Sequence, residues 1–197
     1  MLLIAGSPSA QSRSAALLDA VAYRLAQHNN LAVEMLSVRE LPASPLLLAD
    51  WTHPSVVAAI ARVARAQAVV VATPVYKAAY SGMVKVFLDL LPEAALEGKT
   101  VLPLAIGGSP YHMLALDYAL RSVLQVLSAR HILPGVYATD SQITKADIKA
   151  EGKAYSVGPE LAKRLDEAVA NLMLEGFRVS ATSGFEPVHF SRVRCSV

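Results

Sequence analysis

The sequence predicts an α/β protein in which helices cover both faces of a five-stranded parallel sheet. Short apolar runs alternate with longer amphipathic stretches, which is the pattern of repeated strand–helix–strand units. The clearest run, Ala-Val-Val-Val-Ala at residues 68–72, is continuous and β-branched, as expected of a strand buried on both faces. The 197 residues are enough for one domain with a full core. We assign this domain to residues 1–176 and a C-terminal tail to residues 177–197.

Five apolar runs are the predicted strands. They occupy residues 2–5, 31–36, 68–72, 100–106 and 132–139. Proline at position 103 weakens the prediction of the fourth strand, because proline cannot donate a hydrogen bond to a strand ladder.

The stretches that follow the strands have apolar residues at helical spacing. Helices are expected at residues 12–28, 56–63, 82–91, 112–129 and 158–176. The last of these begins with Gly-Pro-Glu, which places proline in the first turn and an acidic residue near the positive end of the helix. Residues 41–54, which hold three prolines, and residues 140–157 are predicted loops.

The bulk properties exclude several classes of protein. A net charge of +2 is too small to indicate nucleic-acid binding. No apolar run reaches the ~18 residues that cross a membrane, and Met1 leads directly into an apolar strand instead of a signal peptide. A single cysteine, Cys195, excludes an internal disulfide framework and is consistent with a reducing cytoplasm. GxSxG, HExxH and CxxC motifs are missing from the sequence, so we predict no side-chain nucleophile and no metal site.

Ligands of parallel sheets bind beyond the carboxyl ends of the strands, which directs attention to loops 6–14, 73–82 and 107–112. The first loop reads Gly-Ser-Pro-Ser-Ala-Gln-Ser-Arg-Ser. Its serines and the start of the following helix offer donors to a phosphate, and Arg13 adds positive charge. It matches neither GxxxxGK[ST] nor GxGxxG. The alternative interpretation is an ordinary strand–helix turn in which Ser12 is the N-cap.

The other two loops have features that suit a flat heterocyclic ligand. Tyr76, Lys77 and Tyr80 follow the central strand, where a flavin ring would need an apolar face and backbone groups at its edge. Backbone N–H groups of residues 107–109 precede a helix and would stabilise negative charge on a reduced flavin. Each of these residues also has an ordinary structural interpretation. Tyr76 or Tyr80 alone would be a half-buried loop residue, and Lys77 alone would be a solvated side chain. The glycines at 107 and 108 alone would indicate a flexible turn at the end of a strand.

Several motifs resemble the NADPH-dependent FMN reductases of alkanesulfonate utilisation. The most specific is Ala-Thr-Pro-Val-Tyr-Lys-Ala-Ala-Tyr-Ser-Gly at residues 72–82, followed by Lys85 and by Leu-Asp-Leu-Leu-Pro-Glu at 88–93. Further matches lie at residues 5–8, 12–14, 107–108, 116–120 and 140–142. The resemblance extends from residue 1 to about residue 175. It implies a flavodoxin-like fold with strand order 2-1-3-4-5.

The resemblance also implies a function and a set of binding residues. The enzyme would be an oxidoreductase that reduces FMN with NADPH and supplies the reduced flavin to a partner alkanesulfonate monooxygenase. The flavin phosphate would contact Ser7, Ser12, Arg13 and Ser14. The ring would lie against Pro74, Val75, Tyr76 and Lys77, with Gly107, Gly108 and Ser109 at its other edge. The wider flavin reductase family often has arginine directly after Gly-Ser-Pro, where this chain has Ser9, so Arg13 is the candidate to supply that charge.

Tyr118 lies off the apolar face of the predicted fourth helix. From spacing alone it is an exposed tyrosine beside an Asp117–Arg121 pair at i, i+4. The resemblance implies instead that Tyr118 is an inserted residue that forms a π-bulge at a tetramer interface and keeps FMN dissociable. The expected assembly is a homotetramer built as a dimer of dimers.

Three alternative functions share the predicted fold. A reductase of quinones, azo dyes or metal ions would retain its FMN through purification. A one-electron carrier of the flavodoxin type would usually present an acidic face, which the net charge of +2 argues against. A flavin-free receiver domain would need acidic residues at the end of the first strand, where this chain has Gly-Ser.

Overall fold

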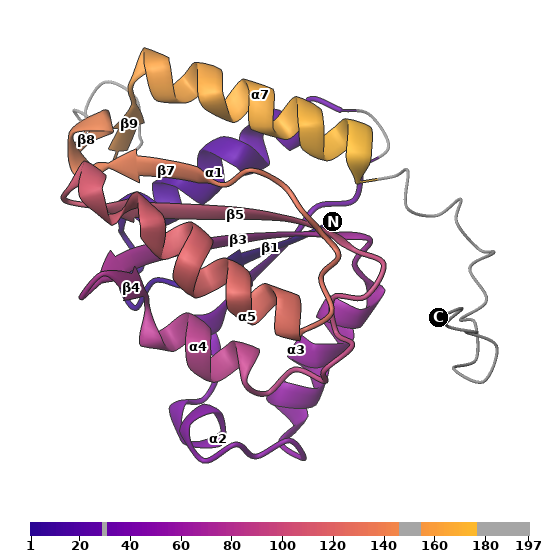
Figure 1. Cartoon of the computed structure of the whole chain (residues 1–197). Coiled ribbons are helices and arrows are strands. Elements are labelled where there is room, and N and C mark those ends of the chain that lie inside the picture. Colours follow the sequence, from indigo (N-terminus) through magenta and orange to yellow (C-terminus); the bar gives the residue numbers. More distant parts are fainter. Residues whose placement is uncertain (29–30, 146–154, 177–197) are drawn as a thin grey trace, which may run out of the picture.

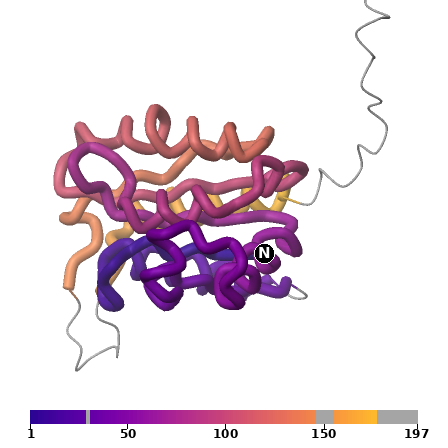
Figure 2. The backbone as a smooth tube through the Cα atoms, turned by 90° about the horizontal axis from the view of Figure 1, so that it is seen from below, coloured from indigo at the N-terminus to yellow at the C-terminus, as the bar shows by residue number. Residues whose placement is uncertain are grey.

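A mostly parallel sheet forms the centre of the protein (Figure 1). The computed structural model describes residues 1–28, 31–145 and 155–176. In chain order, the parallel strands of the sheet are β1 (Leu2–Ala5), β2 (Glu34–Ser37), β3 (Ala68–Tyr76), β5 (Thr100–Gly107), β6 (His131–Ile132) and β7 (Val136–Thr139). The order across the sheet is β2-β1-β3-β5-β6, with β7 also paired to β5. Since β6 and β7 together take the place of the predicted fifth strand, the predicted order 2-1-3-4-5 is confirmed. Figure 2 shows the N-terminal segment, in indigo, and the helical segment around residue 120 on opposite sides of the molecule.

The predicted strand 132–139 is divided, and the division explains how Pro103 lies within β5. Val101 pairs with Ile132 in β6 and Leu104 pairs with Val136 in β7, so Pro103 faces the gap between them. A Cβ atom on Gly135, within that gap, would lie only 3.1 Å from the Pro103 carbonyl oxygen and 3.2 Å from its Cγ. The neighbouring strand is therefore broken where proline has no N–H to offer.

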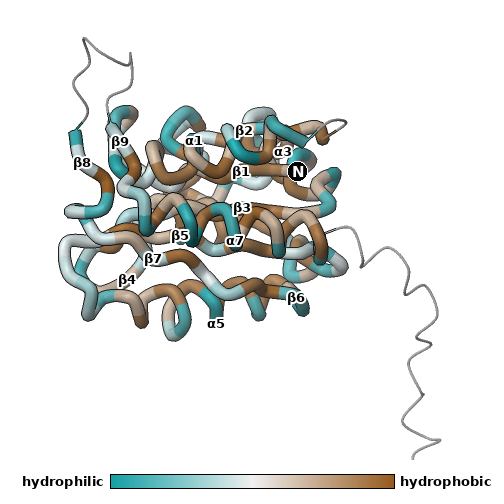
Figure 3. The backbone as a smooth tube through the Cα atoms, turned by 90° about the horizontal axis from the view of Figure 1, so that it is seen from above, coloured by the Kyte–Doolittle hydropathy of each residue, from teal (hydrophilic) through white to brown (hydrophobic). Residues whose placement is uncertain are grey.

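Helices cover both faces of the sheet. One face carries α1 (Arg13–Leu25) and α7 (Pro159–Glu175), and the other carries α3 (Pro54–Arg65), α4 (Gly82–Leu88) and α5 (Arg121–Val126). Side chains of β3 alternate between the two layers: Val70 packs in the α1/α7 core, whereas Val69 and Val71 pack in the α3/α4 core. Figure 3 shows the hydrophobic segments concentrated in the central strands. The continuous apolar run at 68–72 thus results from burial on both faces.

Several predicted boundaries and loops need correction. The second strand begins three residues later than expected, at Glu34, and α4 ends at Leu88. The predicted loop 41–54 contains a short helix, α2 (Ala43–Leu47), after the 3₁₀ turn η1 (Val38–Glu40). The predicted loop 140–157 contains the 3₁₀ turn η4 (Asp140–Gln142) and a hairpin of β8 (Ile143–Lys145) and β9 (Tyr155–Val157). Local turn chemistry and packing on α1 outweigh the polar composition of that segment.

The predicted helix 112–129 is a succession of three helical forms. A 3₁₀ turn, η2 (Pro110–Met113), leads into the π-helical segment η3 (Ala115–Leu120), which continues as α5. Within the described residues, no helix is both long and apolar enough to span a membrane. The predicted tail and Cys195 lie outside those residues, so the boundary at residue 176 stays a prediction.

Candidate functional site

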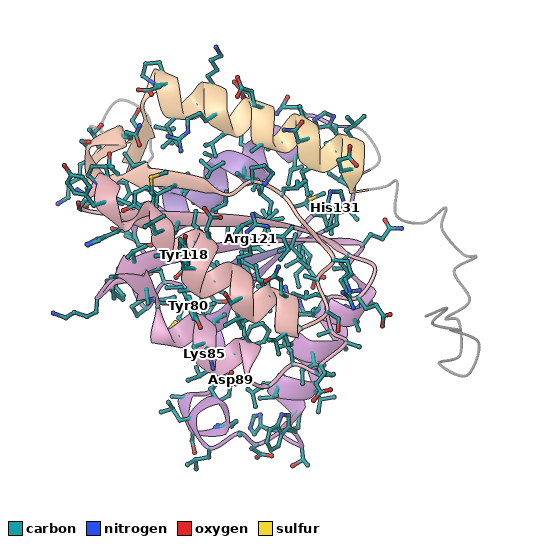
Figure 4. The ribbon with its side chains drawn as sticks, in the orientation of Figure 1. Tyr80, Lys85, Asp89, Tyr118, Arg121 and His131 are labelled. Carbon is teal, nitrogen blue, oxygen red and sulfur yellow. The ribbon has the colours of Figure 1, made fainter. Side chains whose placement is uncertain are left out.

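The carboxyl ends of β1, β3, β5 and β7 form one edge of the sheet, which we call the rim. The three predicted loops all begin at this edge, as they must in a parallel sheet. A fourth segment, η4, follows β7 at the same edge. His131, which begins β6, lies at the opposite end of the sheet, as Figure 4 shows.

The first loop is packed tightly at its start. The Gly6 N–H donates to the Ala72 carbonyl at 2.8 Å, and a Cβ on Gly6 would lie 1.9 Å from Val84 Cγ2. Ser81 Oγ donates to the Gly6 carbonyl at 2.6 Å and also accepts from the Val84 N–H as the N-cap of α4. One serine hydroxyl therefore joins the first loop to the second.

Three of the four predicted phosphate residues, Ser12, Arg13 and Ser14, lie at the start of α1, and Ser7 lies in the loop before it. Ser12 is the N-cap, since its Oγ accepts from the Ala15 N–H at 3.1 Å. It also shares a hydrogen bond with Ser14 Oγ at 3.1 Å. Ser7 is buried and its Oγ accepts from the Ser9 N–H at 3.2 Å. The first turn of α1 has no acidic residue to neutralise the positive end of the helix. The capping role and anion binding are therefore compatible.

Arg13 turns toward the β8–β9 hairpin. Its Nε donates to the Ile143 carbonyl at 3.0 Å, and its Nη1 lies 3.8 Å from Asp140 Oδ2. The guanidinium carbon lies 5.8 Å from the centre of the Tyr155 ring, within the range of a cation–π contact.

The second loop is a tight hairpin between β3 and β4 (Ala79–Tyr80). Tyr76 pairs with Ala79, so Lys77 and Ala78 form a two-residue turn. Both have positive φ, 51° and 62°, as a type I′ turn requires. Pro74 is buried, Val75 is half-buried and Tyr76 is exposed. Left-handed backbone costs about 1–2 kcal/mol for each residue other than glycine, so this turn stores strain at the rim.

The third loop rests on Tyr137, a residue of β7. The Tyr137 hydroxyl donates to the Ser109 carbonyl at 2.6 Å, and a Cβ on Gly107 would lie 2.5 Å from that hydroxyl. Burial, and secondarily the Asp140 carboxylate, raise the pKa of Tyr137 above its ordinary value of 10.0. The phenol is therefore protonated at neutral pH and remains a donor. Gly108, by contrast, is exposed, and Asp140 Oδ2 is the nearest atom to its would-be Cβ, at 3.7 Å.

Sequence reasoning missed three residues that organise this site: Ser81, Tyr137 and Asp140. Ser81 joins two loops, Tyr137 supports the third, and Asp140 lies between Arg13 and Gly108. The signal for Asp140 was available, because it directly follows the last predicted strand and must therefore lie at the rim. The contacts of Ser81 and Tyr137 depend on tertiary packing and have no sequence signature.

Tyr118 lies on the π-helical segment η3, and its side chain is 76% exposed. Figure 4 shows it beside Tyr80, with Lys85 on the neighbouring helix α4 and Asp89 directly after that helix. The expected Asp117–Arg121 pair is present at 3.4 Å, and Arg121 also donates to the Ile132 and Leu133 carbonyls. These bonds attach the segment to the broken outer strand.

The geometry of the rim suits a phosphorylated planar molecule. Serine hydroxyls lie at a helix N-terminus in one turn, and the adjacent Arg13 extends its guanidinium toward the β8–β9 hairpin. The β3–β4 hairpin and the Gly108 turn are exposed. A largely apolar pocket of about 370 Å³ adjoins the first loop through Pro8 and the β3–β4 hairpin through Tyr76. FMN combines the matching features, a phosphate and a flat ring. Among the described residues, no cluster of three His, Cys, Asp or Glu side chains is placed to bind a metal.

Comparison with known proteins agrees with this geometry. Residues 1–144 match the family model described as NADPH-dependent FMN reductase. An FMN reductase (NADPH) of Escherichia coli strain K12 is 43% identical over 171 residues, which cover 86% of this chain and 85% of that protein. One of Pseudomonas putida strain KT2440 is 49% identical over 144 residues, or 73% of each chain. The apo crystal structure of an NADH:FMN oxidoreductase (EMOB) has a TM-score of 0.77 at 35% identity, covering 88% of this chain and 87% of the other.

Proposed function

The chain belongs to the family of NADPH-dependent FMN reductases, and from that membership we propose that it uses FMN as a dissociable substrate and supplies reduced flavin to an alkanesulfonate monooxygenase. It is an oxidoreductase, and FMN and NAD(P)H are its cofactors. The observation that carries the proposal is the family match over residues 1–144, which includes all three rim loops.

We assign the flavin phosphate to Ser7, Ser12, Arg13 and Ser14, because Ser12 and Ser14 lie at the N-terminus of α1, Arg13 is its first residue and Ser7 lies in the loop that leads to it. The ring is assigned to the rim between the β3–β4 hairpin and the third loop. On the side of the β3–β4 hairpin the proposed ring site is lined by Pro74, Val75, Tyr76 and Lys77. On the side of the third loop it is lined by Gly107, Gly108 and Ser109.

When bound, NADPH and FMN supply a hydride donor and a hydride acceptor, so the difficult chemistry resides in the cofactors. The chain contributes orientation. The Thr73 hydroxyl accepts from the Ser81 N–H and donates to the Pro74 carbonyl, both at 2.9 Å, which fixes the base of the hairpin. Tyr137 fixes the opposite turn through the Ser109 carbonyl, and backbone N–H groups of this turn would stabilise negative charge on the reduced flavin.

The coenzyme is proposed to be NADPH. The two curated relatives at 43% and 49% identity are both named for NADPH, whereas the NADH-linked crystal structure is less similar, at 35%. The partner monooxygenase is supported by the specific motif at residues 72–82. The π-helical segment with its exposed tyrosine supports a tetrameric assembly from which FMN dissociates. A cytoplasmic location fits the single cysteine in the chain.

The test is a coupled assay with purified protein. NADPH consumption should depend on added FMN, and the protein should elute from gel filtration largely free of flavin. Addition of an alkanesulfonate monooxygenase and its sulfonate should then release sulfite. NADPH consumption that needs a quinone or azo dye, by a protein that retains its flavin, would instead identify an FMN-retaining reductase.

A further inference from the structure

Arg13 has three neighbours beyond α1: two lie in the β8–β9 hairpin, and the third, Asp140, lies in η4 directly before it. The Ile143 carbonyl accepts from its Nε, the Asp140 carboxylate lies near its Nη1, and the Tyr155 ring faces its guanidinium carbon. Its Nη2 amino group has no hydrogen-bond partner within the described ranges 1–28, 31–145 and 155–176. The side chain is thus ordered while part of its donor capacity remains free.

The paired strands of the hairpin, β8 and β9, are fixed by packing and by hydrogen bonds. The Ile143 side chain is fully buried in the core that α1 and α7 share, and Tyr155 and Val157 pack against the same core. The Gly158 N–H donates to the Gln142 carbonyl at 2.9 Å, which closes the base of the hairpin next to η4. The Gln142 side chain further accepts from the Thr139 N–H at 3.0 Å. The groups that contact Arg13 are therefore themselves fixed.

We propose that the β8–β9 hairpin positions Arg13 for the flavin phosphate and thereby makes the enzyme select FMN over riboflavin. This inference rests on the proposed phosphate site at the start of α1. An arginine that is already ordered loses less rotamer freedom when it binds a ligand, and its guanidinium forms charge-assisted bonds with phosphate. Riboflavin has the same ring but no phosphate, so it gains nothing from this arrangement.

Of the three contacts, the Tyr155 ring is the one to test. The Asp140 carboxylate is half-exposed and 3.8 Å away, so it attracts Arg13 weakly and would also repel a phosphate. The Ile143 contact uses a backbone carbonyl that substitution does not remove. Replacing Tyr155 by leucine preserves apolar packing and removes the ring face, whereas Tyr155→Phe keeps the ring and removes only the hydroxyl.

The experiment measures dissociation constants for FMN and riboflavin by flavin fluorescence titration of the full chain. Tyr155→Leu should weaken FMN binding about threefold to tenfold, the range of a cation–π contact, and leave riboflavin binding unchanged. Tyr155→Phe should retain the normal preference. In the Arg13→Ala background, Tyr155→Leu should cause no further loss, because the ring acts through Arg13. Thermal unfolding checks the fold, and Tyr155→Met replaces the leucine variant if that variant does not fold.

The outcomes separate the two proposals. An Arg13→Ala variant with normal FMN affinity would overturn the phosphate site itself. If Arg13→Ala weakens FMN binding and Tyr155→Leu does not, the phosphate site stands and the positioning role of the hairpin is wrong. Equal losses for FMN and riboflavin in Tyr155→Leu, or tighter FMN binding, would also contradict it.

Discussion

Gly107 and Gly108 are neighbours in one turn, yet their surroundings differ. The missing side chain of Gly107 faces the Tyr137 hydroxyl at 2.5 Å and Val75 Cβ at 3.3 Å, whereas that of Gly108 faces open space with one atom at 3.7 Å. The first glycine therefore allows three segments to approach closely, and the second keeps the rim accessible. The sequence shows two adjacent glycines and does not indicate this division of roles.

The two positions give a matched pair of variants. Gly107→Ala should lower the free energy of unfolding by about 1–3 kcal/mol, because the new methyl group must displace the Tyr137 hydroxyl from Ser109. Gly108→Ala should change stability by less than about 0.5 kcal/mol but weaken FMN binding, since its methyl group would project into the proposed ring site. Urea unfolding and flavin titration measure the two effects. Equal stability losses in both variants would argue against the assignment.

At the scale of elements, the β3–β4 hairpin places two ordinary residues where glycine or asparagine is usual. The Lys77–Ala78 turn has positive φ at both positions. Strained backbone of this kind is concentrated at ligand-binding sites, because the surrounding structure must hold it in place. Here the Thr73 and Ser81 hydrogen bonds supply that support.

We expect Ala78→Gly to raise the free energy of unfolding by about 0.5–1 kcal/mol, since relief of left-handed strain exceeds the entropy that glycine loses on folding. The control is Ala79→Gly, one residue later in β4, which should lower stability by about 0.5–1 kcal/mol because glycine weakens a strand. Chemical denaturation of the two variants against the parent measures both. A destabilised Ala78→Gly variant would mean that the turn is not strained.

The sequence predicts the regular elements better than their ends and interruptions. The run at 68–72 is identified as a doubly buried strand because every residue in it is apolar, and the structure confirms this. The hairpin β8–β9 was predicted as loop, since its buried residue Ile143 stands between polar neighbours. The three loops at the rim follow from topology alone. Their mutual contacts, such as that between Ser81 and Gly6, join residues 75 positions apart and could not be predicted from the sequence.

For the whole molecule, the distribution of exposed apolar side chains bears on assembly. Five large ones lie along the segment from η2 to α5: Tyr111, Met113, Leu114, Tyr118 and Val126. Exposed apolar surface of this kind is typical of interfaces between proteins. It supports the proposal that the π-helical segment takes part in a tetramer.

Deletion of Tyr118 should remove the extra residue from the helical turn and convert the segment to α-helix. The expected result is a smaller assembly that retains FMN after purification. Gel filtration reports the assembly, and the visible absorbance of the purified protein reports the bound flavin. Tyr118→Ala is the control, because it removes the ring and keeps the residue count. A deletion variant identical to the parent in both measurements would refute the role of this segment.

The division of the outermost strand into β6 and β7 also limits how copies of this chain can join. An uninterrupted edge strand offers a row of free N–H and C=O groups on which another chain can add strands indefinitely, which leads to fibrils. Here one edge consists of pieces of two and four residues, and β2 at the other edge has four. Edges this short favour closed assemblies formed through helical faces over open-ended sheet growth.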